Sequence, residues 1–510
     1  MTGQEWRVDN LLLMVLGLGW YQRAVRAGRT VVCAALLAGC SQAIHNEPIN
    51  LPFDPGIKLS AELGRDAATY FDDTVVALSF SGGGTRAAAF SYGVLTGFDE
   101  TRVPSGGRSN SLLDRVDFVT GVSGGSVLAA YYGLKKRKAL ADFKERFLLR
   151  NAEEGLQTEL SLLNIARGLN GGINDTQFPQ WLDDNLFEHA TFKSLLLERR
   201  PMVWINASDI YDRTPFVFGR TPFAALCSDL STYPVSMAVA ASAAVPVVFA
   251  PVVIQNYPGG CPIPLPEWVR QVRHDISAPP LLKLYADALE RYHSGEVRYV
   301  KLLDGGLVDN YGLAAFTIAR LVANTPYAPL EPAEGVKLRR LLFLVVDSGR
   351  APSGAWAQTV DGPSGINLVT AASDTATESG AVGSYSAFAD TMNRWQDVLI
   401  KWRCRLSPAE RQKYGAPPGW NCRDVRLYLA RVSFDLLGPE RATALSAVET
   451  RFKLPPDQVE MVIAAGRDAL KANSVFRSFV KSIGAPPRPA PGTPVASPVE
   501  STLEADAQAQ

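Results

Sequence analysis

Residues 116–127 read V-D-F-V-T-G-V-S-G-G-S-V, and this stretch decides the fold and the chemistry that we expect. The β-branched and aromatic run at 116–120 predicts a buried strand, and residues 126–134 predict a helix. Between them lies G-x-S-x-G, whose glycines allow a sharp turn into a helix N-terminus. The spacing therefore predicts a nucleophile elbow with Ser123 at its tip, although a plain strand-to-helix turn with an incidental serine has the same pattern.

A second glycine-rich turn lies upstream. Residues 81–86 read S-G-G-G-T-R and join an expected strand to an expected helix. Consecutive glycines leave their N–H groups unobstructed, and several such donors aimed at one point can hold an oxyanion. The turn therefore predicts an oxyanion hole formed by Gly82, Gly83 and Gly84. Arg86 could either lock this loop or attract an anionic group.

The same turn has a second interpretation. Gly82, Gly84 and Ala87 fit the G-x-G-x-x-A form of a dinucleotide-binding fingerprint. That fingerprint expects an acidic residue at the end of the next strand, about 20 residues on. Asp99 and Glu100 lie near that distance but follow a helical stretch, which disfavours a dinucleotide site.

A carboxylate that could serve Ser123 lies in residues 302–310, L-L-D-G-G-L-V-D-N. The apolar run 299–303 delivers Asp304 to a Gly-Gly turn, where a carboxylate can approach another backbone and accept a serine proton. The same residues could form an Asx turn closed by its own side chain. Asp309, further into the following loop, is an alternative acid.

A histidine base is a third possibility, because α/β-hydrolase triads run serine, acid, histidine along the chain. The chain has four histidines, all before Asp304: His45, His189, His274 and His293. His274 or His293, with Asp209 or Asp212 as the acid, would satisfy the order. Neither histidine follows a glycine-punctuated strand end, so the pattern favours a carboxylate base.

In order, the segments G-G-G-x-R, G-x-S-x-G and D-G-G resemble motifs of the patatin-like phospholipase family. Residues 241–251, A-S-A-A-V-P-V-V-F-A-P, resemble a fourth segment of that family. The resemblance covers residues 75–348, and it departs at Ala87, where many members have glycine. It implies a Ser–Asp dyad without histidine, which here gives Ser123 and Asp304, beneath the oxyanion loop.

The resemblance also implies a fold and an activity. The fold is α/β: a three-layer patatin-like fold with a mostly parallel central sheet, plus a helical C-terminal extension. The activity is hydrolysis of phospholipid or lysophospholipid acyl esters through an acyl-serine, without a cofactor or metal. Two alternatives stay open: a catalytically silent envelope lipoprotein that binds lipid or a protein partner, and a carboxylesterase for small esters.

The N-terminal region resembles a bacterial lipoprotein signal. Residues 30–39 are apolar and follow three arginines, and residues 37–40 read L-A-G-C, like a lipobox. The pattern predicts cleavage before Cys40 and lipidation of Cys40, and hence a lipid anchor at the periplasmic face of the bacterial outer membrane. A buried core segment with an incidental cysteine is the alternative.

We expect five segments along the chain. They are a signal peptide with lipobox at 1–40, a lead-in linker at 41–74, a patatin-like catalytic domain at 75–350, a mainly helical C-terminal extension at 351–484 and a disordered tail at 485–510.

Charge and cysteine usage narrow the remaining classes. The 51 basic and 51 acidic side chains give zero formal net charge, so nothing electrostatic favours nucleic acid as a partner. No clustered His/Cys spacing indicates a metal site. In an oxidising periplasm, sequence proximity favours disulfides Cys227–Cys261 and Cys404–Cys422, with four unpaired core cysteines as the alternative.

Overall fold

The structure is a computed structural model that describes residues 46–54, 73–105, 108–156, 177–197, 200–259, 262–323, 325–352 and 354–483. Cys40 with the expected signal, Cys261 and the expected tail at 485–510 lie outside the described residues. Within those ranges, no helix is both long and apolar enough to cross a membrane.

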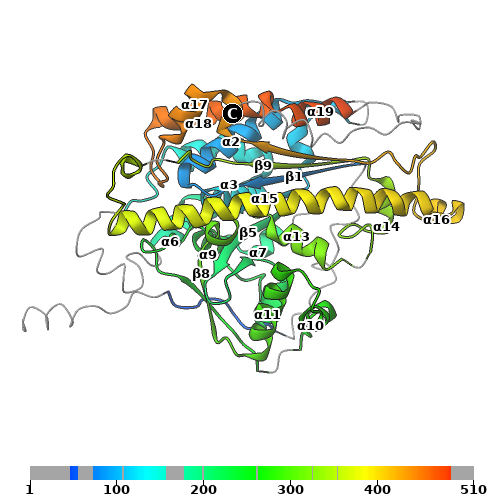
Figure 1. Cartoon of the computed structure of the whole chain (residues 1–510), viewed down its shortest axis with the longest axis horizontal. Helices are drawn as coiled ribbons and strands as arrows, with labels where there is room; N and C mark the ends of the chain where they lie inside the picture. The colour runs from blue at the N-terminus through cyan, green and yellow to red at the C-terminus, as the bar shows by residue number, and fades with distance from the viewer. Residues whose placement is uncertain are drawn as a thin grey trace, which may run out of the picture.

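A mixed sheet of eight strands forms the centre of the molecule (Figure 1). Its strands are β1 (Thr74–Phe80), β4 (Phe118–Val122), β5 (Met202–Asp209), β6 (Thr214–Val217), β7 (Val252–Gln255), β8 (Tyr299–Asp304), β9 (Arg340–Val346) and β10 (Arg426–Val432). β10, β9, β1, β4 and β5 run parallel in that order, whereas β8 and β6 pair with β5, and β7 with β8, in antiparallel fashion. A separate ribbon pairs β2 (Arg102–Ser105) with β3 (Arg108–Ser111).

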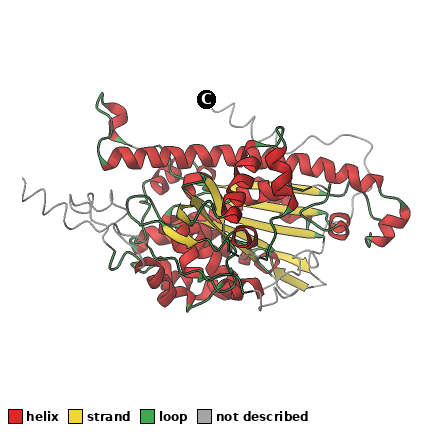
Figure 2. Ribbon diagram, turned by 90° about the horizontal axis from the view of Figure 1, so that it is seen from below, coloured by secondary structure: helices red, strands yellow, loops and turns green. Residues whose placement is uncertain are grey.

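Helices cover both faces of this sheet. They are α2 (Gly84–Glu100), α3 (Gly124–Lys135), α4 (Ala139–Phe143), α6 (Gln177–Leu182), α7 (Phe192–Leu197), α8 (Arg220–Ala225), α9 (Val235–Ser242), α10 (Glu267–His274), α11 (Pro280–Ser294), α12 (Gly306–Asp309), α13 (Ala314–Leu321), α14 (Pro332–Lys337), α15 (Ile366–Arg405), α16 (Pro408–Lys413), α17 (Pro439–Ser446), α18 (Pro456–Ala472) and α19 (Ser474–Ser482). Figure 2 shows the sheet between the long helix α15 and the helices of the opposite face.

Alternate side chains of the central strands enter two separate cores. In β1, Val76 and Leu78 pack with residues of α2, α3 and α18, whereas Val75 and Ala77 pack with residues of α15. A strand buried on both faces has a continuous apolar sequence, which is what residues 75–80 show. The three-layer α/β fold with a mostly parallel sheet is therefore confirmed.

The C-terminal region completes the sheet. β10 pairs with β9 over its whole length and adds an edge strand that the sequence analysis did not predict. α18 crosses α2 so closely that a Cβ on Gly466 would lie 2.1 Å from the carbonyl oxygen of Phe90. Residues 351–483 therefore share the core of the preceding domain, although most of them are helical, as predicted.

α15 is the most prominent element, a 40-residue helix across one whole face (Figure 1). The sequence predicts a helix only over 374–399, where the apolar residues have helical periodicity. Side chains at spacings of three, four and seven anchor its second half in the core, namely Ala381, Phe388, Met392, Trp395 and Leu399.

Two segments expected as loops are ordered differently. Residues 255–280, expected as one long loop, contain α10, because Trp268 stacks on Tyr285 of α11 at a ring separation of 6.4 Å. In the expected lead-in linker, the side chain of Asn46 is buried and donates to the carbonyl of Ala250 at 3.0 Å. Residues 46–54 therefore pack against the domain rather than merely leading into it.

Cysteine pairing agrees with the spacing where the structure describes it. Cys404 and Cys422 form a disulfide with their Cα atoms 4.9 Å apart. Cys227 is also disulfide-bonded, whereas Cys261, its expected partner, lies outside the described residues.

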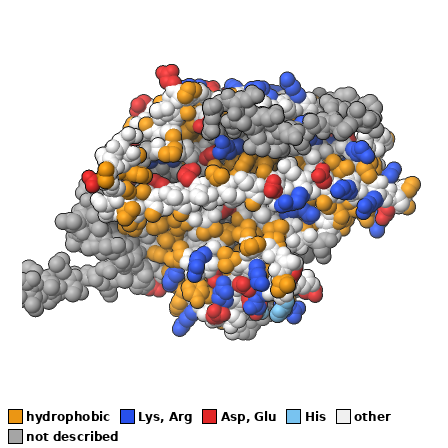
Figure 3. Space-filling view, viewed as in Figure 1, with side chains coloured by type: hydrophobic (Ala, Val, Ile, Leu, Met, Phe, Trp, Pro, Cys, Tyr) orange, Lys and Arg blue, Asp and Glu red, His pale blue; other side chains and the backbone are white. Residues whose placement is uncertain are grey.

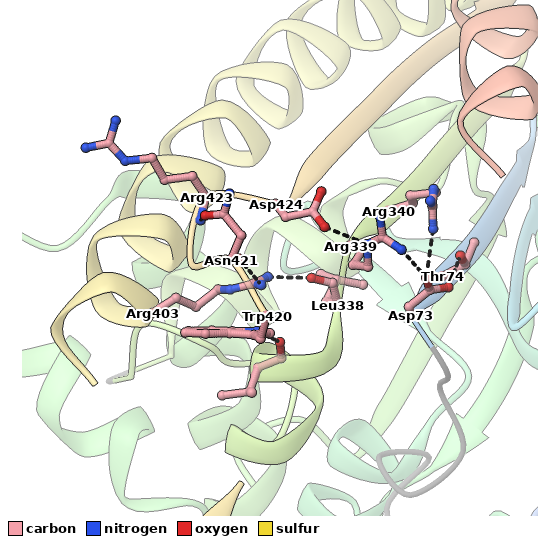
Figure 4. Close-up of polar contacts among 11 residues, drawn as sticks. Asp73, Thr74, Leu338, Arg339, Arg340, Arg403, Trp420, Asn421, Arg423 and Asp424 are labelled. Atoms are coloured by element: carbon pink, nitrogen blue, oxygen red, sulfur yellow. Dashed lines mark hydrogen bonds and ion pairs between the residues drawn. The ribbon is translucent and has the colours of Figure 1, made fainter. Parts of the chain in front are cut away.

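Charged side chains hold the amino ends of the central strands (Figure 4). Arg403 is fully buried, donates to the carbonyl oxygen of Leu338 and lies 5.0 Å from the ring centre of Trp420. Arg339, just before β9, pairs with Asp73, just before β1, at 3.4 Å. Since Ser123 follows the carboxyl end of β4, this network stabilises the opposite end of the sheet.

Candidate active site

Ser123 occupies a strained turn between β4 and α3. It has φ 50° and ψ −124°, a backbone conformation that residues other than glycine rarely adopt. Glycines make this turn possible: a Cβ on Gly124 would lie 1.9 Å from the carbonyl oxygen of Gly84, and one on Gly125 2.5 Å from that of Phe80. Strain of this kind concentrates at reactive positions, and surrounding packing has to maintain it.

The N-termini of α2 and α3 converge beside Ser123. The close approach of Gly124 to Gly84 brings the first turns of the two helices together. Helix N-termini carry partial positive charge and unpaired N–H groups. Among the described residues, the N–H groups of Gly83 and Gly84 have no hydrogen-bond acceptor. These amides could therefore stabilise negative charge that develops near Ser123.

Gly82 does not fit the expected oxyanion hole. Its N–H already donates to Asn310, to the side-chain oxygen at 3.1 Å and to the carbonyl oxygen at 3.2 Å. The carbonyl of Gly82 in turn accepts from the Ser348 hydroxyl at 3.0 Å. Gly82 therefore fixes the loop in place, and Gly83 and Gly84 are the remaining donors of the expected three.

Arg86 supports the loop from inside the protein. The side chain is buried, and it donates to the carbonyl of Ser348 at 3.1 Å and to that of Val448 at 2.7 Å. Burial lowers the pKa of Arg86 to about 10. Of the two roles left open for Arg86, the structure fits loop support and does not fit attraction of an anionic substrate, because its hydrogen bonds go to the protein's own carbonyls.

Asp304 stands at the end of β8 and meets Ser123. Its Oδ1 accepts the N–H of Gly306 at 2.8 Å, and the Ser123 side chain lies close enough to its carboxylate to lower the pKa of Asp304. Gly305 is required beside it, since a Cβ there would lie 2.3 Å from the carbonyl oxygen of Asn206. Burial raises the pKa of Asp304 to about 6, and the contacts with Gly306 and Ser123 offset part of that rise.

This pKa predicts how ester hydrolysis should depend on pH. Asp304 can accept a proton only when it is ionised, so kcat/KM should rise with pH through about 6 and level off above it. The measurement is kcat/KM for a monomeric short-chain ester between pH 4.5 and 8. A profile that stays flat down to pH 4.5 would rule out a base with this pKa.

Ser242, at the end of α9, holds the elbow from behind. Its hydroxyl oxygen accepts the N–H of Ser123 at 2.8 Å, and its O–H donates to the carbonyl of Asn206 at 2.6 Å. Asn206 also donates to the hydroxyl of Thr120 at 2.7 Å. The strained backbone of Ser123 is thus fixed to β4 and β5 by a fully buried network.

Removing this support should loosen the elbow. In Ser242→Ala, the buried Ser123 N–H and Asn206 carbonyl both lose a partner, which costs about 1–3 kcal/mol of stability. We expect kcat to fall more than KM rises, because the nucleophile is displaced while substrate contacts remain. Thermal unfolding and steady-state kinetics measure both effects, with Ser236→Ala in the same helix as the control. Equal kcat values for Ser242→Ala and Ser236→Ala would contradict the role of Ser242 in positioning Ser123.

The alternative acid Asp309 has a different task. It is buried, and its Oδ2 accepts the N–H of Ala314 at 2.6 Å, so it stabilises the start of α13. The nearby Ser384 of α15, whose O–H donates to the carbonyl of Ala381 at 3.1 Å, also lowers the pKa of Asp309. Asp309 therefore connects the turn after Asp304 to the long helix, and Asp304 is the carboxylate that meets Ser123.

The acids proposed for a histidine triad have other partners. Asp209 accepts from the Tyr292 hydroxyl, and Asp212 pairs with Arg291. In the described part of the chain, no histidine hydrogen-bonds to Ser123. Nor do the described residues contain a group of three or more His, Cys, Asp or Glu that could hold a metal ion.

Two positioning residues, Asn310 and Ser242, were not singled out from the sequence. Both lie inside segments that the motifs include, at the end of 302–310 and at the start of 241–251. Asn310 lies six positions after Asp304, beyond the short helix α12, which brings its side chain back to the oxyanion loop.

Residues 78–317 match the model of the patatin-like phospholipase family, so the chain contains a patatin-like phospholipase domain, as the motifs predict. No curated protein matches the chain.

A similar solved structure is the human GIVD cytosolic phospholipase A2, with 11% sequence identity and a TM-score of 0.31. The alignment covers 82% of this chain, and the chain spans 65% of the length of that protein.

Proposed function

We propose that this chain is a serine acyl hydrolase that cleaves acyl esters of phospholipids or lysophospholipids with a Ser123–Asp304 dyad. The observation that carries the proposal is that Ser123, on its strained turn, lies beside the buried Asp304 carboxylate and lowers its pKa. The family match of residues 78–317 supports the lipid substrate class.

The reaction has two halves, each with its proton accounted for. The Ser123 oxygen attacks the ester carbonyl carbon while its proton passes to Asp304, and the amides of Gly83 and Gly84 stabilise the oxyanion. Collapse breaks the ester bond, and Asp304 returns the proton to the departing alcohol. Water then attacks the acyl-Ser123 while its proton passes to Asp304. The bond to the Ser123 oxygen breaks, Asp304 returns the proton to that oxygen, and the fatty acid leaves.

The substrate class is tested with purified protein. Phosphatidylethanolamine vesicles should yield fatty acid and lysophospholipid in equal amounts, at a higher kcat/KM than a short-chain ester. Preference for the short-chain ester would favour the carboxylesterase alternative. Absence of turnover on both substrates would favour the silent lipoprotein and contradict the proposal.

We also propose that the chain is held at the bacterial cell envelope by lipidated Cys40, because residues 30–40 resemble a lipoprotein signal. Two acyl signals or more give stable anchoring, which would keep the enzyme beside its lipid substrates. Mass spectrometry of the mature N-terminus tests this: an intact peptide spanning residues 29–41 would exclude processing at Cys40.

A further inference from the structure

The first half of α15 lies against the candidate active site. A Cβ on Gly306, two residues after Asp304, would lie 3.4 Å from the Thr377 methyl group. A Cβ on Gly380 would lie 3.7 Å from the carbonyl oxygen of Val308, in the same turn. Whatever binds the outer surface of this half of α15 is therefore held next to the dyad.

The solvent-facing stripe of α15 changes character along its length. Exposed residues at alternating spacings of four and three form the uncharged part of the stripe: Leu368, Ala372, Thr375, Ser379, Val382 and Ser386. The same stripe then continues through the exposed residues Asp390, Asn393, Asp397 and Lys401. In Figure 3 the left half of this helix shows white and orange, and the blue side chains along it lie to the right.

The segment before the helix adds apolar side chains to the uncharged part. Trp356 is 46% exposed and Val360 is fully exposed, while Leu368 and Val382 on the helix are 54% and 61% exposed. Residues 351–393 contain no Lys, Arg or His. The first half of the helix, residues 367–380, contains no buried residue, so packing against the domain does not account for its apolar side chains.

We propose that Trp356, Val360, Leu368 and Val382, with the uncharged stripe between them, form a docking surface for a zwitterionic lipid surface. This inference rests on the proposed function and adds how the enzyme reaches aggregated substrate. Docking there holds the turn after Asp304 one helix diameter, roughly 10 Å, from the lipid surface.

The residue types on this docking surface favour a zwitterionic lipid surface as its partner. Tryptophan and aliphatic side chains enter the interfacial zone of a bilayer, and an uncharged helix face enters it without stripping water from ions. The charges within 351–393 are all acidic, namely Asp361, Asp374, Glu378 and Asp390, so the segment would be repelled by an anionic membrane. A second copy of the chain would find no complementary cations there.

The test compares two variants of the full chain on the same helix. Leu368→Asp/Val382→Asp places charge in the uncharged stripe, and Val398→Asp, at a position that is 38% exposed, is the matched control. Both keep the same N-terminal region, so a difference between them reports on α15. The readouts are co-sedimentation with phosphatidylcholine vesicles, with and without added phosphatidylglycerol, light scattering, and hydrolysis of a monomeric short-chain ester.

We expect the double variant to bind phosphatidylcholine vesicles at least about tenfold more weakly, since two buried aliphatic contacts are replaced by charges. Val398→Asp should bind like the unaltered chain, and phosphatidylglycerol should not strengthen binding. All three proteins should hydrolyse the monomeric ester equally.

Three results would overturn the inference: unchanged vesicle binding by the double variant, binding that requires phosphatidylglycerol, or a loss of dimer mass with vesicle binding intact. The ester assay keeps the two proposals apart. If no form hydrolyses the monomeric ester or lipid, the hydrolase proposal fails, and the vesicle comparison still decides the docking surface.

Discussion

Replacing Ser123 by alanine should lower ester turnover by about four orders of magnitude or more, the scale seen when a nucleophilic serine is removed. The mechanism offers no substitute, because the Asp304 carboxylate and the glycine amides can orient a substrate but supply no attacking hydroxyl. Binding contacts stay in place, so KM should change little. Steady-state kinetics on a short-chain ester and on phospholipid vesicles measure the effect.

A glycine at the same position separates chemistry from strain. Ser123 has a positive φ that glycine adopts without cost, so Ser123→Gly should be more stable than Ser123→Ala by about 1 kcal/mol. Both variants should be inactive. Thermal unfolding provides the comparison, and retained turnover in either folded variant would contradict the role of Ser123.

The second large effect is expected in Asp304→Asn, where turnover should fall by about three orders of magnitude or more. Asparagine keeps the shape of the side chain and can still accept the N–H of Gly306. It cannot accept the Ser123 proton, so the hydroxyl remains a weak nucleophile. The rise of kcat/KM through pH 6 should vanish from whatever activity remains.

The same substitution should stabilise the protein above pH 6. The folded-state pKa of Asp304 is raised to about 6, above its ordinary value near 4, so the favourable contribution of the protonated group is lost as pH rises between those values. Asparagine carries no such cost, and the gain at pH 7 should be on the order of 1–3 kcal/mol. Denaturant unfolding at pH 4 and pH 7 measures the difference.

Asp309→Asn is the matched control, because Asp309 is also buried but contacts the start of α13 instead of Ser123. It should leave the rise of kcat/KM near pH 6 in place. If the rise of kcat/KM near pH 6 were unchanged in Asp304→Asn and lost in Asp309→Asn, Asp309 rather than Asp304 would be the base for Ser123.

Local sequence patterns were sufficient to predict the two turns that carry Ser123 and Asp304. Strand, glycine turn and helix follow one another at 116–135, and the chain has little choice there, since a Cβ at Gly124 or Gly125 would meet backbone. The D-G-G turn is similar, because Gly305 lies against Asn206. In both places sterics restrict the backbone locally, and short-range sequence carries that information.

Such local patterns could not predict contacts between residues that are far apart in the sequence. The N–H of Gly82 is used by Asn310, 228 positions away, which no property of the glycine loop itself reveals. β10 has the alternating pattern of an edge strand, but its place beside β9 depends on pairing across the sheet. The start of α15 was underestimated because no side chain of residues 367–373 is buried, whereas the core contact of Phe388 stabilises the helix further along.

The central claim is that Ser123 forms the covalent intermediate with Asp304 as its base. Mass spectrometry after reaction with a fluorophosphonate probe tests it most directly. The account predicts one adduct, on Ser123, which forms faster as pH rises through about 6 and is absent in Asp304→Asn. An adduct on another residue, or rapid labelling of Ser123 in Asp304→Asn, would contradict it.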